Sequence, residues 1–144
     1  MRVLALDYGS ARCGVAVSDV TGTLATPLDV VERPGTKKGM TRIVDVVRER
    51  EAERVVVGLP LGLSGHDTDQ TREAREFAAN LQRRLGKKIP VELEDERFTT
   101  ALAQRDIDPR AAEDSRAAAH LLEGWLSRVM GGSGGQDGPD RQPS

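Results

Sequence analysis

The sequence has little cysteine, few aromatic residues and no long apolar run, and each shortage excludes a class of protein. A single cysteine, Cys13, excludes an intramolecular disulfide and a zinc site built from cysteines. Aromatic residues make up 3% of the chain, too few for base stacking to dominate the binding of single-stranded nucleic acid. No apolar stretch approaches the roughly 18 residues of a membrane span, and we recognise no signal peptide. We therefore expect a cytoplasmic protein without a membrane partner.

Length and charge indicate one ordinary globular domain. The chain has 144 residues, of which 38% are hydrophobic and 31% charged, and this balance is typical of a globular domain that buries a core. The net charge of -2 neither favours nor excludes nucleic acid, because phosphate contacts need only a local basic patch. We expect the domain to span residues 1–130. The remaining residues, 131–144, carry no apolar side chain and are expected to form a disordered tail.

Hydrophobic periodicity predicts three strands followed by strands that alternate with helices. The strands are expected at 3–7, 14–18, 24–31, 54–58 and 89–93, and the helices at 37–52, at 71–85 and from about 109–114 to 130. This order predicts an α/β fold with a five-stranded mixed sheet and helices on both faces.

Asp7 is the first candidate for a functional side chain. It ends the apolar run 3–6, and a carboxylate at the end of a buried strand loses hydration unless a cation or several donors compensate. A second acidic position follows the last predicted strand, at Asp95 or Glu96. Functional sites of such sheets gather beyond strand ends, so we expect the two positions to lie near one another.

The last predicted helix supplies a third carboxylate. Asp114 lies four residues before Ala118, a member of the apolar stripe of this helix, so it projects from the same face toward the sheet. Asp is a favoured N-cap residue, so Asp114 either caps the helix or is a ligand. Both interpretations remain open at this point.

Three carboxylates from separate elements are a typical donor set for a hard divalent cation such as Mg²⁺ or Mn²⁺. Two ions roughly 4 Å apart activate a water and stabilise a leaving oxygen in phosphodiester cleavage. Strand alternation places Asp95 in phase with Val91 and Leu93, which favours Asp95 over Glu96 as the inward group.

Four sequence blocks, in order, resemble one known family. They are Asp7-Tyr8-Gly9-x-x-Arg12-x-Gly14-Val15-Ala16, Gly58-Leu59-Pro60-x-x-x-x-Gly65, Asp95-Glu96-Arg97-Phe98-Thr99-Thr100 and Asp114-x-x-Ala117-Ala118. Together they are similar to the YqgF/RuvX family of pre-16S rRNA nucleases and Holliday junction resolvase-like proteins, over residues 2–130. The segment before Asp114 is shorter and poorer in lysine than is usual in that family.

The resemblance implies an RNase H-like fold in which Asp7, Glu96 and Asp114 are the catalytic, metal-binding triad. It thereby favours Glu96 over Asp95. It also implies a Mg²⁺- or Mn²⁺-dependent hydrolase, an endonuclease or exonuclease, which processes the 5′ end of pre-16S rRNA and also acts on branched DNA. A resolvase that cuts two strands needs a homodimer, whereas RNA trimming needs only a monomer.

Four further residues adjoin the expected site. Arg12, Arg97, Thr99 and Thr100 are candidates for contacts with nucleic-acid phosphates, although ion pairs for the arginines and helix capping for Thr99 are ordinary alternatives. An actin-like ATPase also starts with Asp-x-Gly after a strand, but it needs a second domain, whereas we expect a single domain here. The main rival is a non-catalytic module that binds RNA or a ribosomal or transcription partner, and divalent-ion-dependent cleavage distinguishes it from a nuclease.

Overall fold

The computed structural model describes residues 1–61, 65–96 and 112–131, and in this part of the chain the predicted element order is confirmed. The strands are β1 (Val3–Asp7), β2 (Arg12–Ser18), β3 (Ala25–Glu32), β4 (Arg54–Leu59) and β5 (Val91–Asp95); the helices are α1 (Lys37–Glu49), α2 (Asp69–Leu85) and α3 (Glu113–Leu126), which a π-helical turn (Ser127–Gly131) continues. The expected tail therefore lies outside the described residues, apart from Gly131. None of the described helices is long and apolar enough to cross a membrane.

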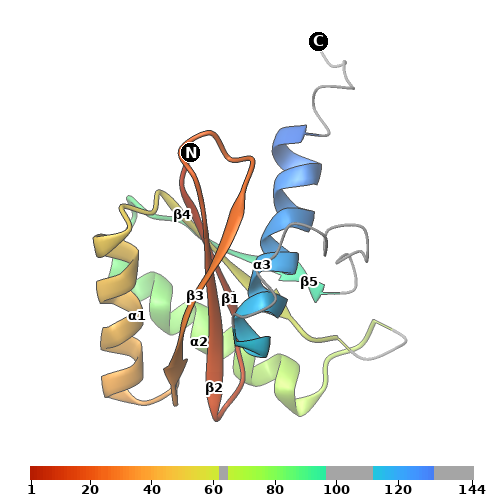
Figure 1. Ribbon diagram of the computed structural model, residues 1–144. Helices are drawn as coiled ribbons and strands as arrows, with labels where there is room; N and C mark the ends of the chain where they lie inside the picture. Colours follow the sequence, from red (N-terminus) through yellow and green to blue (C-terminus); the bar gives the residue numbers. More distant parts are fainter. Residues whose placement is uncertain (62–64, 97–111, 132–144) are drawn as a thin grey trace.

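The five strands form one mixed sheet in the order β3-β2-β1-β4-β5 (Figure 1). The first three strands are antiparallel neighbours, and β4 and β5 run parallel to β1. Pro27 does not interrupt β3 but pairs with Ala16. Proline is tolerated there because β3 is an edge strand, so its missing amide hydrogen breaks no ladder.

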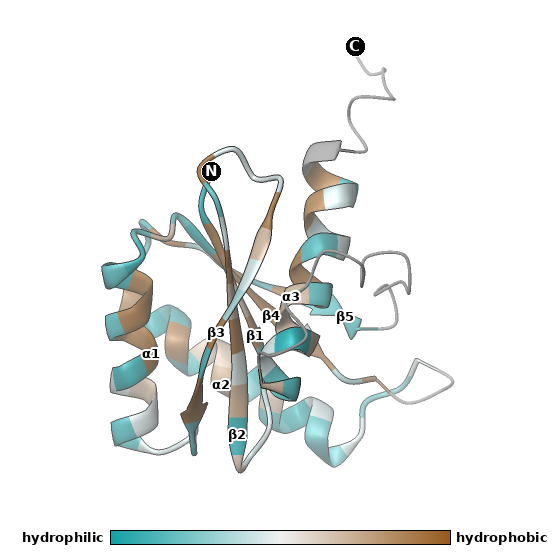
Figure 2. Ribbon diagram, viewed as in Figure 1, coloured by the Kyte–Doolittle hydropathy of each residue, from teal (hydrophilic) through white to brown (hydrophobic). Residues whose placement is uncertain are grey.

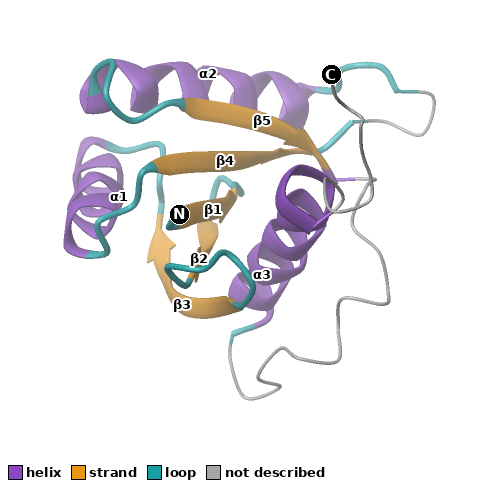
Figure 3. Cartoon of the chain, turned by 90° about the horizontal axis from the view of Figure 1, so that it is seen from above, coloured by secondary structure: helices purple, strands orange, loops and turns teal. Residues whose placement is uncertain are grey.

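Helices cover both faces of the sheet, as Figure 3 shows from above: α1 and α2 lie on one face and α3 on the other. The central strands are apolar on both sides, and Figure 2 shows β1 and β4 largely brown between helices that turn teal residues outward. Leu4 and Leu6 of β1 belong to the core under α1 and α2, whereas Val3 and Ala5 belong to the core under α3. Alternation therefore places Asp7 on the α3 face.

Several element ends differ from the expected positions, and local chemistry explains two of them. The first helix ends at Glu49, before the expected Ala52, because Glu51 takes a left-handed backbone with φ of 55° that a helix cannot continue. The last strand starts at Val91 because it follows Pro90, which has no amide hydrogen to donate to a ladder. The strand runs to Asp95, so Glu96 follows directly at the end of the sheet.

Candidate active site

Asp7 and Glu96 meet at the carboxyl ends of β1 and β5, on the two sides of β4. Their side chains share a hydrogen bond, in which one carboxyl group must be protonated. Burial is the main reason that the pKa of Glu96 rises to about 8, and the charge of Asp7 raises it further. Burial also raises the pKa of Asp7, which the hydrogen bond from Glu96 opposes. The proton therefore resides on Glu96, and Asp7 accepts.

Gly58, the penultimate residue of β4, leaves room for this contact. A Cβ atom placed on Gly58 would lie 3.0 Å from Cγ of Glu96 and 3.1 Å from its Oε2. Such distances are shorter than ordinary van der Waals contacts, so a side chain at Gly58 would push Glu96 away from Asp7. The absence of a side chain on the middle strand is thus part of what lets the two carboxyl groups approach one another.

Asp114 reaches the same end of the sheet from α3, and its charge acts on Asp7. It does not cap the helix: the N-cap is Ala112, whose side chain makes no capping hydrogen bond. Asp114 is the second residue of the helix, and its carboxylate faces Arg12, with 2.8 Å between Oδ2 and the Nε that donates to it. Of the two interpretations that the sequence left open, the capping one is wrong.

Two contacts hold the start of α3 against β2 and thereby fix the position of Asp114 relative to the sheet. A Cβ on Gly14 would lie only 1.8 Å from the carbonyl oxygen of Asp114, so this approach of helix to strand requires glycine. Next to it, the amide of Val15 donates to Oγ of the buried Ser115, at 3.2 Å. Gly14 therefore serves the close packing of α3 on β2. Gly9 does serve the turn, because a Cβ there would lie 2.7 Å from the carbonyl oxygen of Arg12.

The three carboxylates are a suitable donor set for a hard divalent ion, although their side chains are not yet arranged around one. As the side chains lie, no three His, Cys, Asp or Glu residues of the described part are grouped closely enough to hold an ion. Asp114 is turned toward Arg12, whose Nε donates to its Oδ2. The chemistry of the donors fits Mg²⁺ or Mn²⁺, both of which prefer carboxylate oxygens.

Strand alternation alone favours Asp95 over Glu96, but Glu96 is the residue that meets Asp7 in the structure. Asp95 is indeed in phase with Val91, which packs against the core under α1 and α2. The sheet, however, is covered on both faces, so the apolar side of β5 is not the side that carries Asp7. Glu96, in phase with Glu92 and Glu94 on the α3 face, is the residue that reaches Asp7.

The acidic side of β5 holds a buried glutamate, paired with an exposed arginine, that the sequence analysis missed. Glu94 is 5% exposed and pairs with Arg128 of the π-helical turn, and Glu92 pairs with Arg54 while Trp125 Nε1 lies 3.4 Å from its Oε1. These contacts neutralise the two glutamates that precede Glu96 on the same face. The spacing of glutamates at every second residue was the signal that this face of the strand is polar.

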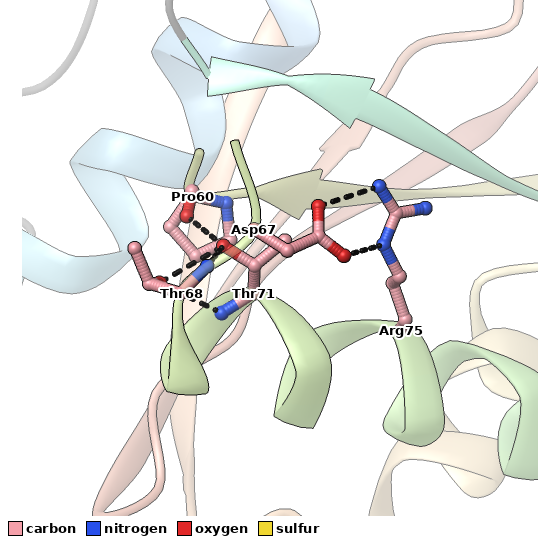
Figure 4. A network of polar contacts seen from close by, with 5 residues as sticks. All are labelled: Pro60, Asp67, Thr68, Thr71 and Arg75. Carbon is pink, nitrogen blue, oxygen red and sulfur yellow. Dashed lines mark hydrogen bonds and ion pairs between the residues drawn. The ribbon is translucent and has the colours of Figure 1, made fainter. Parts of the chain in front are cut away.

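The loop after β4 is tied to the start of α2, which borders the same end of the sheet (Figure 4). Thr68 caps the helix, and its hydroxyl lies 2.9 Å from that of Thr71, which in turn donates to the carbonyl oxygen of Pro60. Asp67 receives two hydrogen bonds from Arg75, at 2.9 and 3.1 Å, and these lower its pKa. The sequence block that begins at Gly58 thus has a structural role in fixing this loop.

The remaining candidates, Arg97, Thr99 and Thr100, lie outside the described residues, as does the short segment that precedes Asp114 from residue 97 to 111. Their contacts with phosphates stay predictions. Arg12 is described, and its ion pair with Asp114 corresponds to the ordinary alternative that was weighed for it. That contact raises the pKa of Arg12.

Comparison with known proteins connects this geometry to a family. The family model described as "RuvX: Holliday junction resolvase" matches residues 1–128. Two bacterial relatives bear the name "Putative pre-16S rRNA nuclease": one from Maridesulfovibrio salexigens is 36% identical over 90% of this chain and 100% of its own length. The other, from Mycobacterium ulcerans, is 39% identical over 94% of this chain and 84% of its own length.

Solved structures show the same fold at lower identity. RuvC of T. thermophilus in complex with a Holliday junction substrate superposes with a TM-score of 0.62, 18% identity, and coverage of 91% of this chain and 96% of that one. The Fowlpox virus Holliday junction resolvase superposes with a TM-score of 0.53, 11% identity, and coverage of 90% and 100%. These likenesses confirm the RNase H-like fold. The match of the family model over residues 1–128, together with relatives that are 36% and 39% identical over most of the chain, shows that the chain belongs to the RuvX family.

Proposed function

We propose that this protein is a divalent-ion-dependent nuclease that hydrolyses phosphodiester bonds of structured nucleic acid, with the 5′ end of pre-16S rRNA as its first substrate. The observation that carries the proposal is the convergence of Asp7, Glu96 and Asp114 from three elements at one end of the sheet. The names of the relatives support the RNA substrate. Branched DNA is the second substrate, because the family model and the RuvC complex both refer to Holliday junctions.

The charge of the site explains why a metal ion suits it. Three carboxyl groups close together repel one another when ionised, and the shared proton of Asp7 and Glu96 relieves that repulsion. Mg²⁺ or Mn²⁺ would replace that proton and be held by Asp7, Glu96 and Asp114. Such ions, if bound as a pair, would supply an activated water and stabilisation of the leaving oxygen. Arg12, which pairs with Asp114 in the absence of an ion, would then be available to a substrate phosphate.

The test is a cleavage panel with Mg²⁺ or Mn²⁺ over a pre-16S rRNA fragment, a Holliday junction and an unstructured RNA. The parent is run beside Asp7→Asn, which keeps the shape of the side chain but removes the charge that attracts the ion. We expect cleavage by the parent and its loss in a folded Asp7→Asn protein, and the product lengths distinguish endonuclease from exonuclease action. A parent protein that binds these substrates but cleaves none would instead support a non-catalytic binding module.

A further inference from the structure

The position of Glu96 depends on an edge strand. In the described sheet β5 has β4 as its one neighbour, and Glu96 must reach past β4 to contact Asp7. The hydrogen bonds of the ladder fix the register of β5, but the end of an edge strand opens more readily than the centre of a sheet. Contacts between the end of β5 and α3, which lie side by side in Figure 1, therefore help to decide where Glu96 lies.

Glu94 makes such a contact from the position two residues before Glu96. Alternation along a strand directs both side chains to the α3 face. Both residues also border Gly58: Glu94 is its partner in the parallel register, and Cγ of Glu96 lies 3.0 Å from the position that a Cβ of Gly58 would take. A displacement of Glu94 would consequently move Glu96 away from β4 and from Asp7.

The carboxylate of Glu94 is buried and depends on one arginine. Its side chain is 6% exposed, and its Oε1 atom pairs with Nη2 of Arg128, in the π-helical turn that continues α3. Its second oxygen, Oε2, is buried and has no hydrogen-bond partner among the described residues. Removing the partner of a buried charge leaves that charge uncompensated, which is much more costly than the loss of an exposed pair. Without Arg128, the carboxylate of Glu94 would therefore turn toward water and draw the end of β5 away from α3.

Glu92 offers a contrast on the same face of the same strand. It pairs with Arg54, and the two side chains are 38% and 31% exposed, respectively. Water reaches this carboxylate, so the loss of Arg54 would leave it solvated and would cost little. Glu92 also lies two residues farther from Glu96 than Glu94 does. Its ion pair is therefore a suitable control for an effect that is specific to the end of the strand.

We propose that Glu94 and Arg128 are positioning residues of the nuclease site. Their ion pair holds the end of β5 against α3 and so keeps Glu96 within reach of Asp7 and of a divalent ion. The inference rests on the proposed function for the role of Glu96 as a ligand. A pair with a structural role alone would lower stability without changing what Glu96 contributes, whereas a positioning pair is coupled to Glu96.

The first experiment is a double-mutant cycle of thermal unfolding in EDTA, between Arg128→Met and Glu96→Ala. In the parent, Glu96→Ala removes the contact with Asp7 and changes the melting temperature. In Arg128→Met that contact is already lost, so the same substitution should have a smaller effect. We expect the two changes to depart from additivity by about 3 °C or more, whereas Arg54→Met and Glu96→Ala should add to within about 1 °C.

Two further variants separate position from charge. Arg128→Lys keeps a cation beside Glu94, and Glu94→Leu/Arg128→Met replaces the ion pair by apolar side chains, which buried sites often tolerate without loss of stability. Neither leaves a buried carboxylate without a cation, so in both the effect of Glu96→Ala should return to its parent value. An effect that stays small with the apolar pair would show a direct action of the Arg128 charge on Glu96 and would overturn the proposal. Should Arg128→Met not fold, Arg128→Gln takes its place, since glutamine keeps a donor to Glu94 but lacks the charge.

The second experiment measures the dissociation constant for Mn²⁺ by titration calorimetry. We expect it to rise about tenfold in Arg128→Met, as is usual when a residue that orients a metal ligand is removed. It should stay within about twofold of the parent value in Arg128→Lys, in the apolar pair and in Arg54→Met. Cleavage at saturating Mn²⁺ should follow the same order.

Additive melting temperatures, or parent affinity for Mn²⁺ in a folded Arg128→Met protein, would overturn the proposal. Equal coupling of Glu96→Ala to Arg54→Met and to Arg128→Met would do the same, because it would show a general loosening of β5. Failure of the nuclease proposal is recognised separately, as a parent protein that neither binds Mn²⁺ nor cleaves. The cycle in EDTA still decides in that case whether Arg128 positions Glu96, because no ion takes part in it.

Discussion

Glu96 donates a hydrogen bond to the carboxylate of Asp7, although the two residues come from strands separated by β4. Two ionised carboxylates at this separation would repel one another, so the contact requires a proton. Burial supplies the reason that the proton is held at neutral pH, and Gly58 supplies the space. The relationship has consequences for stability and for ion binding.

Stability should fall with rising pH because of Glu96. Its pKa is about 8 in the folded protein and near 4.5 in the unfolded chain, so the folded state binds the proton more tightly. The contribution of protonated Glu96 to the free energy of unfolding is fully present below pH 4.5 and is lost as the pH rises through 8. In Glu96→Gln this decline should be absent, so the melting temperature of the variant relative to the parent should increase across that window in EDTA. A constant difference between the two proteins would contradict the shared proton.

The outline of the fold could be predicted from the sequence because periodicity reports burial. The run at 3–6 is apolar throughout, as befits a strand covered on both faces, and β1 was placed with its correct ends. Ends that depend on one backbone angle, such as that of α1 at Glu51, were less predictable, because glutamate rarely adopts a positive φ.

The site could be predicted only in part. The position of Asp7 at the end of a buried strand indicates its role. For the second carboxylate, strand alternation favours Asp95, and only the family resemblance selects Glu96. Strand alternation does not identify the residue that meets Asp7, because both faces of this sheet are covered. The face that carries the apolar side chains of β5 is therefore not the face that carries the site. The ion pair between Arg12 and Asp114 joins residues about a hundred positions apart, and no local pattern encodes it.

Gly14→Ala should damage both packing and activity. The added methyl would overlap the carbonyl oxygen of Asp114, at 1.8 Å, so α3 must shift away from β2. Overpacking of this kind costs about 1–3 kcal/mol of stability, and the shift also withdraws Asp114 from the other carboxylates. The only tryptophan, Trp125, is buried on α3 and reports the movement. We expect a lower melting temperature, altered tryptophan fluorescence and loss of most cleavage; parent values for all three would refute the close approach.

Arg12→Gln should strengthen binding of a divalent ion in the absence of nucleic acid. The variant removes a positive charge and releases the Oδ2 atom of Asp114. Both side chains are partly exposed, 57% for Arg12 and 39% for Asp114, so water screens the pair and its contribution is small. We expect the dissociation constant for Mn²⁺, measured by titration calorimetry, to fall about two- to fivefold. RNA affinity measured with the divalent ion bound should fall in the same variant, because Arg12 is available to a phosphate only when Asp114 holds the ion. Unchanged affinity for both ligands would exclude these roles.

Asp114→Ser separates the role of Asp114 as a ligand from any role in forming the helix. Ala112, not Asp114, occupies the N-cap, so serine at position 114 should leave α3 intact. Removing one of three neighbouring carboxylates reduces repulsion, while the loss of the ion pair with the half-exposed Arg12 costs little. The protein without metal should thus be about as stable as the parent or more so, as judged by thermal unfolding in EDTA. With saturating Mn²⁺, cleavage should fall by orders of magnitude, and the stabilisation that the ion gives the parent should shrink. Glu113→Gln, which changes the neighbouring first-turn acid, is the matched control and should retain cleavage. A folded Asp114→Ser protein that cleaves at the parent rate would remove Asp114 from the catalytic site.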